Sequence, residues 1–191
     1  MLKCVTFGYR NEGLLLHAWA SQFTRHLGIV VPANRENEPT TAAIRRLAFA
    51  YGPRFLVQNG KDDPELIEQL SRLGPDIILV HCYTYRLTPP VLIIPRLGCI
   101  NIHPGKLPEY RGPRPIEAAK AKREKQLWVT LHYMNEGFDT GELIASEVVE
   151  SGAWPPASIE MTRAGLRLLE RWWPAICDET APRMPQGGQV D

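Results

Sequence analysis

The stretch Cys99-Ile100-Asn101-Ile102-His103-Pro104 decides the fold of this chain. In an extended strand the side chains alternate between two faces, so Asn101 and His103 lie on one face and the two isoleucines on the other. Proline cannot donate a hydrogen bond to a sheet, so Pro104 is predicted to end the strand. His103 then lies at the carboxyl edge, where open α/β sheets bind their ligands. The stretch therefore predicts a strand that carries polar side chains into a site.

Short apolar runs alternate with helical patterns around this strand, which indicates a doubly wound parallel sheet. The predicted strands are Lys3 to Gly8, Gly28 to Pro32, Arg54 to Val57, Asp76 to His81, Cys99 to His103, Leu127 to Met134 and Glu142 to Val149. The predicted helices are Asn11 to His26, Thr40 (as cap) to Tyr51, Glu65 to Leu73 after Asp62 or Asp63, Pro115 to Lys122 and Ser158 to Cys177. We expect one three-layer, mostly parallel, Rossmann-like α/β domain over residues 1–180. Residues 181–191 are rich in proline, glycine and glutamine, which predicts a flexible tail.

Composition narrows the class of protein. The chain has 191 residues, of which 44% are hydrophobic and 23% charged, and its formal net charge is +1. This balance lacks the strong positive charge of a general nucleic-acid binder. The four cysteines are scattered, so neither a zinc site nor a disulfide framework is indicated. No apolar run reaches the ~18 residues of a membrane helix, and the first residues read as a strand, so we expect a cytoplasmic protein without a membrane segment.

Three polar residues carry the predicted chemistry: Asn101, His103 and Asp139, the last in Gly137-Phe138-Asp139-Thr140-Gly141. An amide donor, an imidazole and a carboxylate that converge on one point suit acyl transfer, in which an amine attacks a carbonyl. A donor aimed at the carbonyl oxygen is worth ~10² to 10³ in rate, and a placed acid or base ~10² to 10⁴. Taken singly, each residue also fits an ordinary turn or strand end. The combination is what favours a catalytic site.

The order of four short motifs is more specific than any one of them. Asn-x-His-Pro is followed by Leu107-Pro108-x-Tyr110-Arg111-Gly112, then by Val129-Thr130-Leu131-His132, then by Asp139-Thr140-Gly141. With this pattern the sequence resembles the formyltransferase family that uses N10-formyltetrahydrofolate. The resemblance implies a formyltransferase fold, Asn101, His103 and Asp139 as catalytic residues, N10-formyltetrahydrofolate as co-substrate and no metal. We expect the Asp139 carboxylate to raise the pKa of His103, so that a protonated imidazole stabilises the oxyanion.

The resemblance also implies binding residues. The folate is expected at the segment Tyr83 to Pro89, with Tyr83, Tyr85, Arg86, Leu87 and Asp139 as donor-binding residues. The acceptor is expected at Arg10, Pro104, Gly105, Lys106, Tyr110 and Arg111, with Arg111 as a charge clamp or a structural ion pair. Two segments depart from the family: Gly105-Lys106 replaces the usual Ser-Leu, and the amino-terminal loop Gly8 to Gly13 carries bulky and acidic insertions. His132 and His81 are expected near the site in supporting roles.

The acceptor is the least constrained part of this interpretation. We expect the primary amine of a small molecule, such as an amino sugar nucleotide or an amino acid. Methionyl-tRNA formyltransferases have an additional carboxyl-terminal domain, and this chain has little basic excess, so tRNA is expected to be an unlikely partner. The alternatives are a formyltetrahydrofolate hydrolase, methionyl-tRNA formylation and a non-catalytic folate-binding protein. Trp172-Trp173 in the last helix is expected in the core or on an oligomer face, so a homodimer is a candidate assembly.

Overall fold

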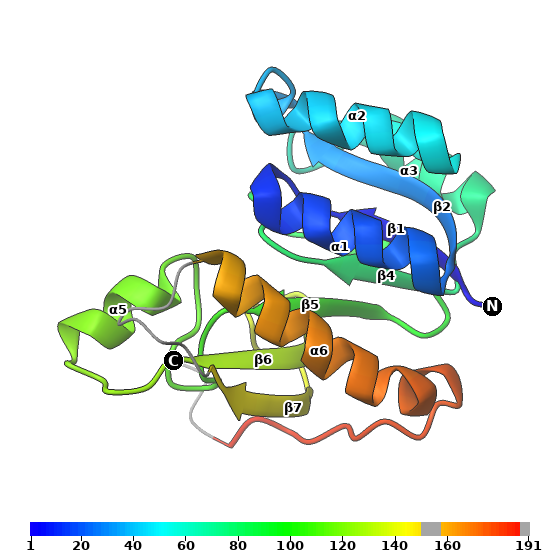
Figure 1. Ribbon diagram of the computed structural model, residues 1–191. Helices are drawn as coiled ribbons and strands as arrows, with labels where there is room; N and C mark the ends of the chain where they lie inside the picture. The colour runs from blue at the N-terminus through cyan, green and yellow to red at the C-terminus, as the bar shows by residue number, and fades with distance from the viewer. Residues whose placement is uncertain (150–157, 188–191) are drawn as a thin grey trace. The chain divides into compact units, whose positions relative to one another are not determined.

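The computed structural model of the chain describes residues 1–149 and 158–187, which fall into two compact units. The first unit comprises residues 1–100, and the second begins at residue 101. Both units combine helices with strands (Figure 1). Each is described here by itself.

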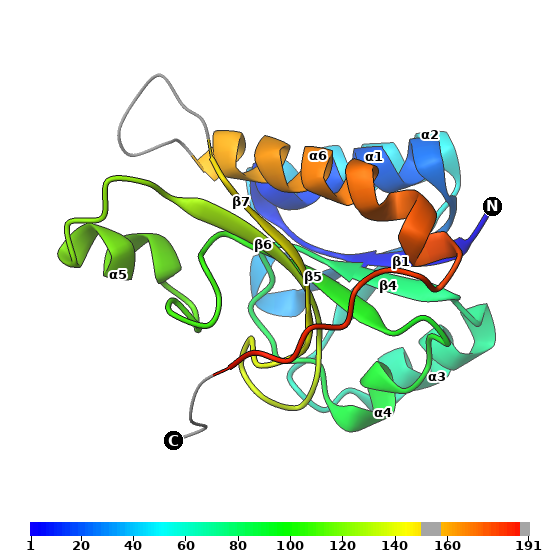
Figure 2. The same ribbon diagram turned by 90° about the horizontal axis from the view of Figure 1, so that it is seen from below.

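The first unit is built on four parallel strands in the order β3-β2-β1-β4. The helices lie on both faces of this sheet, α1 and α2 on one and α3 and α4 on the other, which gives three layers (Figure 2). Its elements are β1 (Lys3–Phe7), α1 (Arg10–Phe23), β2 (Arg25–Pro32), η1 (Ala33–Arg35), α2 (Pro39–Tyr51), β3 (Arg54–Gln58), α3 (Pro64–Leu73), β4 (Ile77–Val80) and α4 (Pro89–Leu92).

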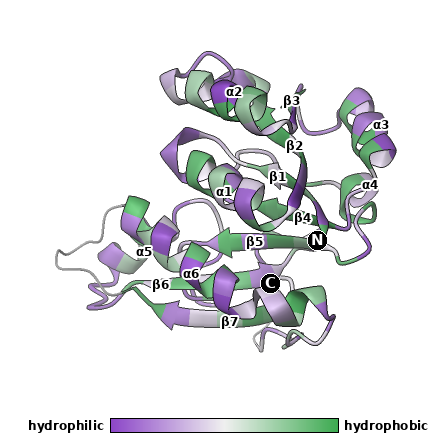
Figure 3. Cartoon of the chain, turned by 45° about the vertical axis from the view of Figure 1, so that its right-hand side comes forward, coloured by the Kyte–Doolittle hydropathy of each residue, from purple (hydrophilic) through white to green (hydrophobic). Residues whose placement is uncertain are grey.

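The helix ends of this unit follow from local chemistry. The Asp63 side chain accepts a hydrogen bond from the backbone N–H of Leu66, and Pro64 occupies the first helical position of α3. Gly52 and Gly74 end α2 and α3 with left-handed backbone conformations, which glycine adopts without steric cost. All four residues of β4 are buried, as expected of a strand covered on both faces. Figure 3 shows the strands largely hydrophobic and the helices mixed.

The second unit contains β6 (Trp128–Tyr133) and β7 (Leu143–Val148), which pair antiparallel, and β5 (Cys99–His103), which begins before the boundary between the units. The strand order is β5-β6-β7. Helix α6 (Ser158–Cys177) contacts β6 and β7, and α5 (Pro115–Ala121) follows β5 in the chain. Gly165 allows α6 to approach closely, because a Cβ there would lie 2.3 Å from the Ile102 side chain. No helix within the described ranges is long and apolar enough to cross a membrane.

The observed elements confirm the predicted α/β class and its mostly parallel sheet. Two local predictions were wrong. Arg25 and His26 belong to β2 rather than to the first helix, because they pair with Lys3 and Cys4 of β1. Thr40 does not cap α2; Glu38 is the cap residue, and Pro39 occupies the first turn.

The carboxyl-terminal segment differs from the expected tail in the part that the structure describes, residues 181–187. Met184 pairs with Leu143 of β7 through backbone hydrogen bonds, and Gln186 is bonded to the loop that carries Asp139. A loosely held tail would not make such contacts. The flexibility predicted for residues 188–191 lies outside the described residues, and the domain boundary at residue 180 stays a prediction.

Candidate active site

Asn101, His103 and Asp139 meet in the second unit. Strand β5 supplies the first two, and Asp139 lies in the loop between β6 and β7. The Asn101 Nδ2 donates to Asp139 Oδ1 at 3.4 Å, and His103 Nδ1 lies 3.4 Å from Asp139 Oδ2. The side chains of His103 and Asp139 are 4% and 16% exposed, so this carboxylate keeps a small opening to solvent. Asn101, His103 and Asp139 thus form one polar cluster, as the motif order predicted, although Asp139 lies 38 positions after Asn101 in the sequence.

His103 is held by the loop that follows β5. Its Nε2 lies 2.7 Å from the backbone oxygen of Tyr110, which can only accept, so Nε2 carries a proton. Nδ1 then carries a proton only when the ring is an imidazolium. Burial lowers the pKa of His103 below its usual value, although the Asp139 carboxylate and the Tyr110 carbonyl act in the opposite direction. Asp139 acts on the pKa of His103 in the expected direction, but the expected net rise was wrong, because desolvation outweighs the nearby charge.

Asp139 is fixed by its backbone as well as by its side chain. It adopts a left-handed conformation with φ 52°, which aspartate tolerates better than most residues. The Gly112 N–H donates to its Oδ2 at 2.9 Å. Burial alone would raise the pKa of Asp139, but His132, His103 and this N–H together hold the pKa below its usual range. Burial therefore favours the neutral form of His103, while its polar neighbours favour the ionised form of Asp139.

The glycines on either side of Asp139 are required by close packing. A Cβ on Gly137 would lie 2.1 Å from Thr140 Oγ1, and one on Gly141 would lie 1.8 Å from the Tyr133 carbonyl oxygen. The Asn135 side chain ties the same loop together by accepting from the Gly137 N–H at 3.0 Å and the Thr140 hydroxyl at 2.7 Å. The Gly-x-Asp-Thr-Gly motif thus describes a tight loop that presents one carboxylate.

His132 of β6 is a fourth member of the cluster. Its Nδ1 lies 2.8 Å from the Tyr133 carbonyl oxygen, and its Nε2 lies 3.2 Å from Asn101 Nδ2 and 3.5 Å from Asp139 Oδ1. The Tyr133 carbonyl can only accept, so Nδ1 carries a proton, and the lone pair of an unprotonated Nε2 would accept from the Asn101 amide and orient it. The side chain is 1% exposed. This supporting position is the one that the sequence predicted for His132.

The residues after β5 pack against the catalytic imidazole. Gly105 is buried, and a Cβ there would lie 2.9 Å from His103 Nε2 and 2.7 Å from the Pro115 Cβ. Its carbonyl accepts the Thr130 hydroxyl at 2.7 Å. Gly105, which stands where the family pattern has serine, therefore lies where His103 and Pro115 leave no room for a side chain. The Tyr110 side chain is buried, and its hydroxyl donates to Glu124 at 2.5 Å.

The Arg111 guanidinium contacts a glutamine in the part of the chain that the structure describes, and its role as a charge clamp or a structural ion pair stays a prediction. Its Nε and Nη2 donate to Gln186 Oε1 at 3.0 and 2.8 Å. Gln186 Nε2 in turn donates to the backbone oxygens of Asp139 and Gly141 at 2.8 and 2.7 Å. Sequence reasoning missed Gln186, because a glutamine in a proline- and glycine-rich stretch carries no signal of its own.

The other predicted acceptor residues are more exposed. Pro104 and Lys106 are half-buried at the end of β5, and the Lys106 ammonium lies 2.8 Å from Glu109 and 5.5 Å from the centre of the Trp128 ring. Arg10 belongs to the first unit. It is exposed, has φ 60°, and its guanidinium lies 5.1 Å from the centre of the Tyr9 ring. Their contact with an acceptor stays a prediction.

The segment predicted to bind the folate is an irregular loop of the first unit. Leu87 is 1% exposed, and the Tyr83 hydroxyl donates to Gln58 at 2.7 Å. The Tyr83 ring also makes edge contacts with Phe7 and Tyr85, at centroid distances of 5.2 and 6.2 Å. Tyr85 and Arg86 are half-buried. Recognition of a folate by the loop backbone would require side chains that anchor the loop, and Tyr83 and Leu87 do this. The residues therefore fit a folate. Folate binding at this loop stays a prediction.

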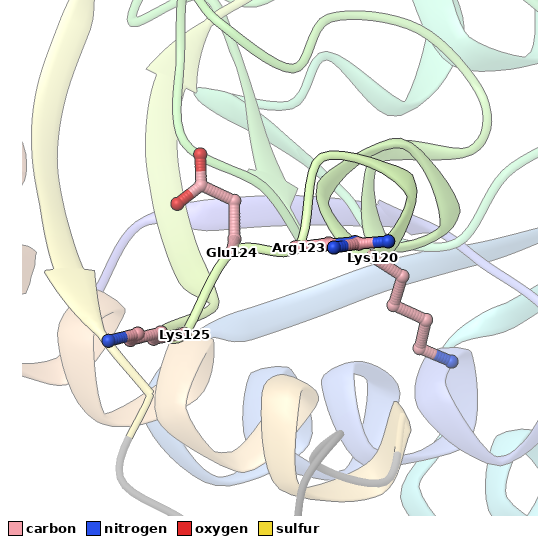
Figure 4. A pocket seen from close by; sticks show the side chains of 4 residues that line it. All are labelled: Lys120, Arg123, Glu124 and Lys125. Atoms are coloured by element: carbon pink, nitrogen blue, oxygen red, sulfur yellow. The ribbon is translucent and has the colours of Figure 1, made fainter.

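A pocket beyond the end of α5 is lined by Lys120, Arg123, Glu124 and Lys125, whose side chains point in different directions (Figure 4). They do not converge on a ligand. Within residues 1–149 and 158–187, no group of three or more histidine, cysteine, aspartate or glutamate side chains is placed to hold a metal ion.

Comparison with known proteins gives the same family as the motifs. The formyl transferase family model matches residues 25–161. A methionyl-tRNA formyltransferase from Pelotomaculum thermopropionicum is 32% identical over 82% of this chain and 51% of its own length. One from Methylacidiphilum infernorum is 34% identical over 83% of this chain and 51% of its own length. The chain therefore spans about half the length of the curated relatives that it matches.

Solved structures show the same fold at lower identity. A phosphoribosylglycinamide formyltransferase from Streptococcus pneumoniae has a TM-score of 0.69 at 20% identity and covers 94% of this chain and 98% of its own. The formyltransferase PseJ from Anoxybacillus kamchatkensis, in complex with a formamido sugar nucleotide and tetrahydrofolate, has a TM-score of 0.62 at 19% identity and covers 99% of this chain and 84% of its own.

These findings correct one prediction. The curated relatives are methionyl-tRNA formyltransferases, so the expectation that tRNA is an unlikely partner was wrong. With a family model that matches more than half of its residues, and relatives above 30% identity over four-fifths of its length, this chain belongs to the formyl transferase family.

Proposed function

We propose that this protein transfers the formyl group of N10-formyltetrahydrofolate to a primary amine, with Asn101, His103 and Asp139 as catalytic residues. The observation that carries the proposal is their convergence: both the amide nitrogen of Asn101 and the Nδ1 of His103 lie 3.4 Å from the Asp139 carboxylate. Membership of the formyl transferase family supports the reaction class. An amide, an imidazole and a carboxylate around one point fit a formyl group.

N10-formyltetrahydrofolate supplies a formyl carbon that an amine can attack. The Asn101 N–H that reaches Asp139 is the proposed donor to the formyl oxygen, because a hydrogen bond of 3.4 Å is long and easily exchanged. His132 holds the other N–H of the same amide and so aims it. A donor placed where negative charge develops is worth ~10² to 10³ in rate.

Asp139 and His103 are proposed to handle the proton. A neutral His103 directs the lone pair of Nδ1 toward a carboxylate oxygen 3.4 Å away, an arrangement that a proton between them would stabilise. The pair therefore takes one proton from the attacking nitrogen and returns it to the departing nitrogen. One carbon–nitrogen bond forms and one breaks, without any change in oxidation state. A placed acid and base contribute ~10² to 10⁴.

The acceptor is proposed from the comparisons. Curated relatives that are 32–34% identical are methionyl-tRNA formyltransferases, which makes the amine of methionyl-tRNA the first acceptor to test. Small amines, such as amino sugar nucleotides and amino acids, form the second class. Within these proposals, Arg10 and Lys106 are the cations offered to an acidic group of the acceptor. A cytoplasmic location belongs to the same proposal, supported by four cysteines that are all free thiols.

The test measures transfer of a labelled formyl group from N10-formyltetrahydrofolate to methionyl-tRNA, to sugar nucleotides with a free amine, to amino acids and to no acceptor. We expect formylated product with at least one amine and much slower release of formate when the acceptor is omitted. Formate release at the same rate with and without acceptors identifies a hydrolase. Binding of the donor with neither product refutes the proposed activity.

A further inference from the structure

Gln186 connects two loops that carry parts of the candidate active site. Its Oε1 accepts two hydrogen bonds from Arg111, at 3.0 and 2.8 Å, and its Nε2 donates to the carbonyl oxygens of Asp139 and Gly141 at 2.8 and 2.7 Å. The amide therefore uses both of its ends, each toward a different loop. A side-chain amide can do this because it carries an acceptor oxygen and a nitrogen with two donors.

The two loops meet a second time beside the catalytic carboxylate. Gly112, the residue after Arg111, donates its N–H to Asp139 Oδ2 at 2.9 Å. Tyr110, the residue before Arg111, accepts from His103. Consecutive residues thus hold the imidazole, the Gln186 amide and the carboxylate. A shift of this loop relative to Asp139 would change both contacts of the acid.

The position of Gln186 is itself fixed by the segment that carries it. Met184 pairs with Leu143 through backbone hydrogen bonds of 2.8 and 3.0 Å, and Arg183 lies 3.7 Å from the centre of the Tyr133 ring. This segment runs alongside β7 (Figure 1). The amide is therefore presented from an ordered strand-like segment, not from a free end.

We propose that Gln186 is a positioning residue that keeps the Asp139 loop in register with the 110–112 loop. It acts through Asp139 and does not touch the reacting atoms. The expected effect of Gln186 on kcat rests on the proposed function. Its structural consequence, a fixed distance between Asp139 and His103, can be measured without any turnover.

Two substitutions separate the ends of the amide. Gln186→Leu keeps the volume and removes both sets of hydrogen bonds. Gln186→Glu keeps the acceptor for Arg111 but replaces the donor with a carboxylate that faces two carbonyl oxygens. The same two substitutions at Gln126, an exposed glutamine outside both loops, are the matched controls. We expect both Gln186 variants to lower kcat about tenfold to a hundredfold, the size of loss that a misplacement of ~1 Å produces. The KM for the amine should change far less than kcat.

The activity-independent readout is the titration of the His103 imidazole, followed by NMR. The charged and titratable groups that face this ring are Asp139 and His132, together with the Tyr110 carbonyl. Because Asp139 favours the protonated imidazole, Gln186→Leu should lower the pKa of His103, in the same direction as Asp139→Asn. Adding Gln186→Leu to Asp139→Asn should produce no further change.

Several results would overturn the inference. The first is a folded Gln186→Leu protein whose kcat and His103 titration are both unaltered. The second is a Gln186→Leu protein that loses only thermal stability. The third is a double variant in which Gln186→Leu and Asp139→Asn shift the pKa of His103 by the sum of their separate shifts. Should Gln186→Leu fail to fold, Arg111→Gln breaks the same link from the other side and should move the titration in the same direction by less. A moved titration in a protein without transferase activity would retain the positioning role and reject the proposed function. An active enzyme in which Gln186→Leu leaves the titration of His103 unchanged would retain the proposed function and reject the positioning role.

Discussion

Replacing Gly105 with alanine tests how tightly the imidazole of His103 is packed. The added Cβ would lie 2.7 Å from the Pro115 Cβ and 2.9 Å from His103 Nε2. Ordinary contacts between such atoms are ~3.5–4.0 Å, so both neighbours must move away, each by roughly 0.6–1.3 Å. The Gly105 carbonyl is tied to the Thr130 hydroxyl at 2.7 Å, which opposes a shift of the backbone instead. The strain therefore falls on His103 and Pro115.

The expected losses follow from that displacement. Overpacking of this size costs about 1–3 kcal/mol of unfolding free energy. A catalytic group displaced by ~1 Å loses about a hundredfold in kcat. Urea unfolding and steady-state formyl transfer measure the two effects. Gly187→Ala, at a position where a Cβ meets open space, is the control that should change neither. A Gly105→Ala protein with unchanged stability and unchanged kcat would refute the packing argument.

Three further predictions concern the acid, the buried histidines and a helix cap. Asp139→Asn should lower kcat ~10²- to 10⁴-fold in steady-state formyl transfer, because it removes the acid–base group. Burial lowers the pKa of His17 to about 3 and of His26 to about 4, so below pH 6.5 the unfolded chain binds more protons than the folded chain. As the pH drops from 6.5 toward these lowered pKa values, the unfolding free energy should fall by about 1.4 kcal/mol per pH unit for each ring. Urea unfolding at a series of pH values measures this fall. Asp63→Ala should cost about 0.5–2 kcal/mol by removing the α3 cap, measured by thermal unfolding.

Each of these has a result that contradicts it. An Asp139→Asn enzyme with the rate of the unaltered protein removes the carboxylate from the mechanism. For the histidines, a double His17→Gln, His26→Gln variant should reduce the pH dependence between pH 6.5 and 4 to the part that His103 contributes, and an unreduced dependence would contradict the assignment to His17 and His26. For the cap, equal stability of Asp63→Ala and the parent chain would show that the hydrogen bonds that the Asp63 carboxylate accepts from the backbone N–H groups of Leu66 and Asn59 contribute nothing.

The parts of the fold that sequence predicts well are those set by local patterns. Strand β5 ends at His103 because Pro104 follows it, and α3 begins at Pro64 after an aspartate cap. Apolar spacing up to Phe23 predicts a helix that also includes Arg25 and His26. Their strand conformation depends on pairing with β1, a long-range contact that no local pattern reports.

In the candidate site, too, the sequence predicted some residues and missed others. Residue types and motif order predicted the group of Asn101, His103 and Asp139. The sign of the His103 pKa shift was not predictable, because it depends on the balance between burial and the charge of Asp139. The partners of His103 and Asp139 on the 110–112 loop are backbone atoms, which have no residue-type signature. Gln186 lies 47 residues beyond Asp139, within a stretch whose composition resembles a disordered tail.

The most direct test of the account is the additivity of the catalytic residues, measured as kcat for formyl transfer by His103→Gln, Asp139→Asn and the double variant. Groups that move one proton together are strongly non-additive, so the double variant should be no more than a few-fold slower than the slower single variant. A double variant whose loss equals the product of the two single losses would contradict the shared role of this histidine and this aspartate.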